Sequence, residues 1–89
     1  MSRYLHGNDM AVYARLPRGG RIVFQTGDHS PPHFHAEFGS DVAVFSIRTG
    51  EVLRGRLAPQ GERVVREWYR RAPEADVRRM MEAWYDFLS

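Results

Sequence analysis

The chain of 89 residues is long enough for one domain and too short for a second independent core, so we treat residues 1–89 as a single domain. Hydrophobic residues make up 43% of it and aromatic residues 12%, which excludes an intrinsically disordered chain. Cysteine is absent, which excludes disulfides, thiolate metal sites and cysteine nucleophiles. The formal net charge is +2 and all 13 basic residues are arginine, a composition that allows a phosphate- or carboxylate-bearing partner without requiring one.

The sequence contains no segment for insertion into a membrane. No stretch approaches the roughly 20 apolar residues of a membrane-spanning helix, and residues 1–10 lack the apolar core of a signal peptide. Together with the absence of cysteine, these features predict a cytoplasmic protein that does not associate with a membrane.

Strand signals recur at short intervals through the first two thirds of the chain. Residues 41–47 are the most apolar of these segments, which predicts a central strand. Gly39 and Ser40 suit a two-residue hairpin, and Gly50 suits a turn position with a left-handed backbone. The five expected strands are residues 11–16, 21–26, 33–38, 41–47 and 51–57.

The last third of the chain has the periodicity of helices. Apolar residues form one stripe in residues 61–72, and Pro73 ends this helix and suits the first turn of the next, residues 73–89. Strands at about 11–57 followed by helices at about 60–88 predict an α+β fold, a small antiparallel meander packed by two C-terminal α-helices. The large apolar side chains expected in its core include Trp68, Met80, Met81 and Trp84.

Three of the four histidines lie within seven positions, around the double proline of residues 31–32: His29, His33 and His35. Because side chains alternate along a strand, His33 and His35 are expected on one face, about 6.5–7 Å apart, with Phe34 on the other.

The stretch DHSPPHFHAEFG, followed by VAVFSIRTGEVLRGRLAP and RVVREW, resembles a widespread bacterial family of small proteins known as domain of unknown function 4160. The resemblance covers about Val23 to Trp84, and its specific part is the run H-x-P-P-H-F-H-A followed by the hairpin T-G-E-V-L-x-G. The family positions present here are His29, Pro31, Pro32, His33, Phe34, His35, Thr49, Gly50, Glu51, Gly55 and Trp68.

Membership in this family would imply a compact cytoplasmic bacterial domain, often encoded beside another small protein in an arrangement like a toxin–antitoxin pair. It would imply no activity. The chain departs from the family pattern before residue 21, and the histidine that usually follows the tryptophan is replaced within YRRAPE, residues 69–74. If that histidine belongs to the family's site, this member has lost one part of it.

The histidine cluster suggests a metal site. Two imidazoles at this spacing can share one ion, each at about 2.0–2.1 Å for zinc. The expected ligands of a divalent metal, zinc or iron, are His29, His33, His35 and Glu37, since Glu37 continues the same face and the prolines stiffen the chain after His29. The alternative is that the imidazoles only form hydrogen bonds with the loop backbone.

The same histidines also allow a metal-independent ribonuclease, so whether the protein is an enzyme stays open. His33 and His35 would act as general acid and base, because imidazole titrates near neutral pH. Arg54 and Arg56, which alternate along one strand, would hold the phosphate. The alternative for these arginines is a solvated edge strand.

A third alternative is a non-catalytic binding or regulatory module, in which arginines and tyrosines of the helices form the contact surface. Such a surface allows a small protein partner, a homodimer or nucleic acid. Our working hypothesis is metal binding by the histidine cluster, in a protein that acts with a small protein partner.

Overall fold

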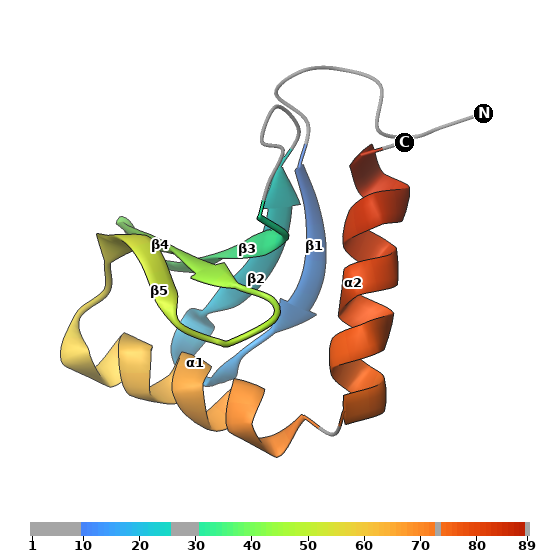
Figure 1. Ribbon diagram of the computed structural model, residues 1–89. Coiled ribbons are helices and arrows are strands. Elements are labelled where there is room, and N and C mark those ends of the chain that lie inside the picture. The colour runs from blue at the N-terminus through green and yellow to red at the C-terminus, as the bar shows by residue number, and fades with distance from the viewer. Residues whose placement is uncertain (1–9, 26–30, 73, 89) are drawn as a thin grey trace.

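The computed structural model describes residues 10–25, 31–72 and 74–88 and confirms the predicted α+β fold (Figure 1). One antiparallel meander has the strand order β1-β2-β3-β4-β5, and two helices follow it. The strands are β1 (Met10–Arg15), β2 (Arg21–Gln25), β3 (His33–Phe38), β4 (Asp41–Ser46) and β5 (Val52–Arg56); the helices are α1 (Pro59–Arg71) and α2 (Glu74–Leu88). No helix in these ranges is both long and apolar enough to cross a membrane.

The middle strand of the five is β3. β4 does lie inside the sheet, between β3 and β5, and its Ala43, Val44 and Phe45 are buried. The apolar run of residues 41–47 therefore predicts a central strand correctly, and β3 in addition buries two histidines that an apolar count leaves out.

Two glycine turns set the register of β3, β4 and β5. Gly39 has a φ of 59° in the tight turn that pairs Phe38 with Asp41, as predicted. Gly50 has a φ of 76°, also as predicted, and a Cβ atom at this position would lie 2.4 Å from the ring of Tyr69. The hydroxyl of Tyr69 donates to the carbonyl oxygen of Ile47 at 2.6 Å, so α1 is held against the β4–β5 turn.

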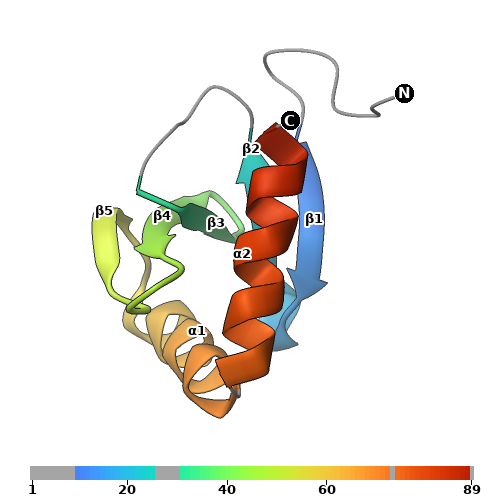
Figure 2. The same ribbon diagram turned by 45° about the vertical axis from the view of Figure 1, so that its right-hand side comes forward.

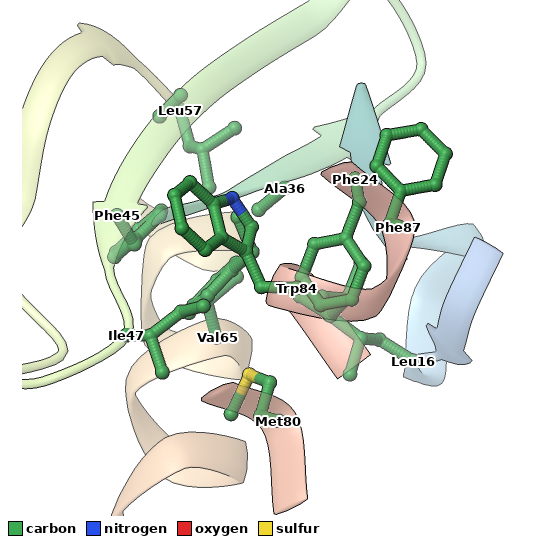
Figure 3. Close-up of a cluster of buried hydrophobic side chains, with 13 residues drawn as sticks. Leu16, Phe24, Ala36, Phe45, Ile47, Leu57, Val65, Met80, Trp84 and Phe87 are labelled. Atoms are coloured by element: carbon green, nitrogen blue, oxygen red, sulfur yellow. The ribbon is translucent and has the colours of Figure 1, made fainter. Parts of the chain in front are cut away.

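Both helices contribute to a core on one face of the sheet (Figures 1 and 2). Phe34 stacks on Phe45 with 5.4 Å between ring centroids, and Trp68 of α1 meets Phe34 edge-on. α2 lies along β1 and β2, where Phe87 approaches Phe24. Figure 3 shows buried side chains of this core, among them Phe45, Trp84 and Phe87, converging from the sheet and the helices.

The expectation that the tryptophans and methionines of the helices belong to the core is confirmed. Met80 and Trp84 are fully buried, and Trp68 and Met81 are half-buried against the core.

β2 and β3 pair over a short distance and then separate. Their register runs from Arg21 opposite Glu37 to Val23 opposite His35, and no pair is formed beyond it within the described parts of the two strands. Both strands continue past this point, so they diverge (Figure 2). We call this opening the β2–β3 fork; it is flanked by Phe24 on β2 and His33 on β3.

Replacing Gly50 with alanine is expected to lower the free energy of unfolding by about 3 kcal/mol, because strain at positive φ adds to overlap with the Tyr69 ring. The matched control is Gly39→Ala, where φ is also positive but no atom lies within 4 Å of the new Cβ atom. This control is expected to lose about 1 kcal/mol. Urea denaturation measures both, and equal losses would show that the Tyr69 contact contributes nothing.

Candidate functional site

β3 places His33 and His35 on the face opposite to Phe34 and Ala36. Phe34 and Ala36 are fully buried in the core that faces α1 and α2. Strand partners share a face, and His35 lies between Val23 on β2 and Val44 on β4, neither of which belongs to this core cluster. The imidazoles therefore lie on the opposite face, as the alternation of residues 33–38 predicts.

Both imidazoles are buried, and His33 also meets the indole of Trp84 on α2. His33 is 4% exposed and His35 is 7% exposed, while the neighbouring Val23 and Val44 are 0% and 5% exposed. A buried imidazole needs hydrogen bonds, ring contacts or a ligand to compensate for lost hydration. Both histidines make such interactions in the structure.

A backbone carbonyl group orients His33. Its Nδ1 atom lies 2.8 Å from the carbonyl oxygen of Pro31. Because a carbonyl oxygen can only accept, Nδ1 carries the proton and donates, which leaves the lone pair of the neutral ring on Nε2. The adjacent carbonyl of Pro32 accepts the N–H of Ile47 at 3.1 Å, so the proline corner is itself tied to the chain that follows β4.

The two imidazoles form an adjacent pair. The ring centroids of His33 and His35 are 5.5 Å apart, and the ring planes meet at 68°. On one tetrahedral zinc ion with bonds of about 2.0–2.1 Å to nitrogen, the centroids of two imidazoles lie roughly 5 Å apart. The observed separation therefore suits two rings that share one ion with little movement.

Apolar side chains lie beside this pair, together with the polar Ser46, which is paired with His33 on β4. The indole of Trp84 lies edge-on to His33 across the β2–β3 fork, with 5.8 Å between ring centroids. Val23 and Val44 flank His35 from the neighbouring strands. Such surroundings limit access of water and strengthen the bonds between a metal ion and its ligands.

Glu37, a predicted ligand, has another partner. Its Oε1 atom accepts a hydrogen bond of 3.1 Å from Nε of Arg21, and the second guanidinium contact completes an ion pair across β2 and β3. Within the described residues, no three histidine, aspartate or glutamate side chains come close enough to hold a metal ion. The predicted ligand His29 lies outside the described residues.

The arginines predicted to hold a phosphate lie on the edge strand β5. Arg54 is opposite Val44 and Arg56 is opposite Val42, so both belong to the face that carries His35. Two strand spacings separate Arg54 from His35, or about 10 Å between Cα atoms. Both arginines are exposed, whereas the imidazoles are buried.

Three residues of the site were not predicted, namely Val23, Val44 and Trp84. The alternation within residues 21–26 and 41–47 indicates which face the two valines take, but not that they flank His35. That proximity requires the register of β2 and β4 against β3. No local pattern in the sequence indicates that Trp84 lies beside His33, because this contact depends on how α2 packs against the sheet.

The fold and the histidine pair define a small α+β domain with a five-stranded meander and a buried imidazole pair on its middle strand. A family model described as Domain of unknown function (DUF4160) matches residues 19–85. The chain belongs to this family, which confirms the resemblance carried by the H-x-P-P-H-F-H-A run. Searches of curated proteins and of solved structures found no match.

Replacing Glu37 with glutamine is expected to lower the free energy of unfolding by about 1 kcal/mol, because it removes a half-buried ion pair with Arg21. Chemical denaturation measures the loss, and Glu82→Gln, an exposed position on α2, is the control. In a double-mutant cycle with Arg21→Gln, the two losses should not be additive. Additive losses would show that the pair does not stabilise the fold.

Proposed function

We propose that this protein binds a divalent transition metal ion through His33 and His35. The observation that carries the proposal is the separation of 5.5 Å between the two ring centroids, which suits bonds from both imidazoles to one ion. Imidazole is a ligand for zinc and for iron, and zinc is the first candidate because it needs no particular geometry beyond four ligands.

The hydrogen bond between His33 and Pro31 supports this proposal. Histidines that bind metals commonly donate their other ring N–H to a carbonyl or carboxylate group, which sets the tautomer and the orientation of the ring. The Nδ1 atom of His33 makes such a bond, at 2.8 Å. Nε2 is then the atom of His33 that would bind the ion.

Two imidazoles do not complete a zinc site, which takes four ligands. In this proposal His29 supplies the third ligand, because it is the remaining histidine of the H-x-P-P-H-F-H-A run. Glu37 keeps its ion pair with Arg21 and is not required. The fourth position is then open to water or to a group of a small protein partner, the kind of association that family membership suggests.

Burial of the histidines argues against the metal-independent ribonuclease. A general base has to reach the proton that it removes, within hydrogen-bonding distance or through one water. His33 and His35 are 4% and 7% exposed, so an RNA 2′-hydroxyl could not approach both rings without a rearrangement of the strand surroundings. The same burial does not prevent binding of a single metal ion.

Isothermal titration of the EDTA-stripped protein with zinc chloride tests the proposal. The wild-type chain is expected to bind about one ion, and His33→Ala and His35→Ala are each expected to weaken binding by more than about 100-fold. His29→Ala tests the third ligand in the same way. The matched control is His6→Ala, which removes the one histidine outside the cluster and should bind as the wild type does. Unchanged affinity in both His33→Ala and His35→Ala would refute the proposal.

A second measurement separates loss of binding from loss of folding. At a free zinc concentration of about 100 times the dissociation constant, the free energy of unfolding of the wild type should rise by about 2.7 kcal/mol. The alanine variants at positions 33 and 35 should show no such rise, while circular dichroism in EDTA shows that they fold. A wild-type protein whose stability does not respond to zinc would contradict metal binding by the native state.

A further inference from the structure

A groove of about 1090 Å³ runs along α1. It extends from Pro59 at the start of α1 to Ala72 after its end, which corresponds to roughly 20 Å of helix. The turn between β4 and β5 and the end of β5 form its other side, and neither His33 nor His35 lines it. We call it the α1 groove.

The floor of the α1 groove is apolar, and contacts within the chain hold it in place. Gly50, Leu57, Tyr69 and Val77 contribute to it. Tyr69 donates its hydroxyl to Ile47, and its ring lies against Gly50 with no room for a Cβ atom between them. Burial raises the pKa of Tyr69, which keeps this hydroxyl protonated as a donor at neutral pH. A ligand would therefore meet a surface that is already formed, which lowers the entropy lost on binding.

The rim of the α1 groove carries an excess of positive charge. Four arginines and two glutamates line it: Arg56, Arg63, Arg66, Arg70, Glu62 and Glu67. Arg66 pairs with Glu62 at 2.9 Å, and Arg70 pairs with Glu67. Across residues 10–25, 31–72 and 74–88, Arg56 and Arg63 have no carboxylate within ion-pairing distance, and both are exposed. These two guanidinium groups can each bind a carboxylate through two hydrogen bonds.

Two features distinguish between an acidic peptide and a nucleic acid strand as the occupant. Glu62 and Glu67 interrupt the row of arginines, so a strand with evenly spaced phosphates would meet repulsion at both. Stacking along a single strand also uses successive aromatic side chains, whereas Tyr69 is the single aromatic residue among the described residues that line the groove. Apolar side chains suit the floor, and separated carboxylates suit Arg56 and Arg63.

From this charge and surface complementarity we propose that the α1 groove binds a short peptide segment of a protein partner, in which acidic residues are interspersed with apolar ones. The apolar side chains of the segment contact Tyr69 and Val77, which are half-buried, and its carboxylates pair with Arg56 and Arg63. This site is separate from the metal site, so its occupation does not depend on zinc.

Selection of a random peptide library displayed on phage tests the inference, with the full chain as the target. Acidic and apolar peptides should be enriched on the wild type, and the synthesised, fluorescently labelled peptides should bind Arg56→Glu/Arg63→Glu more than about tenfold more weakly. Selection on this reversed variant should enrich basic peptides instead. The matched control is Arg78→Glu, an exposed arginine of α2 outside the groove, which should bind as the wild type does.

Three outcomes would overturn the proposal. The first is a selection that enriches no peptide, and the second is a set of enriched peptides that bind the reversed variant as tightly as the wild type. The third is a labelled oligouridine that binds more tightly than every selected peptide and loses binding in the reversed variant, which would assign the groove to RNA. Both arginines are exposed, so their replacement is expected to leave the fold intact. Circular dichroism of the variants checks this.

Discussion

The pleat of β3 is the constraint on which both the core and the histidine site depend. Phe34 and Ala36 enter the core on the side of the helices, so the residues before and between them must take the other side. A slip of one residue would exchange the two sets, placing imidazoles in the core and a phenylalanine at the site. The register is held on one side by the Gly39 turn to β4 and on the other by the Arg21–Glu37 pair with β2.

The β2–β3 fork links the two faces of this strand. Where the strands part, the indole of Trp84 belongs to the core and also meets the ring of His33 edge-on. One side chain of α2 therefore contacts both the packed interior and the site. The floor of the groove along α1 depends instead on the contacts of Tyr69 with Gly50 and Ile47. The protein thus has two candidate sites with different chemistry, a buried imidazole pair and an apolar groove with an arginine rim.

Much of this organisation could be predicted from the sequence, with specific exceptions. The ranges of the elements, the positive φ of Gly39 and Gly50 and the shared face of His33 and His35 follow from local patterns. The burial of the imidazoles on β3 did not, because an apolar count cannot recognise a strand that buries histidines. Nor did the partner of Glu37, since Arg21 reaches it only through the register of β2.

The sequence by itself therefore determined the order and type of the elements and the direction of each side chain along β3. These properties depend on the alternation of side chains along strands, on helical periodicity and on the positions of glycine and proline, all of which act over a few residues. Only the tertiary structure decided that the two imidazoles are buried, that Trp84 meets His33 and that α1 and the β4–β5 turn enclose a groove. Each of these brings together residues far apart in the chain, and their contact depends on strand register and helix packing rather than on local preference.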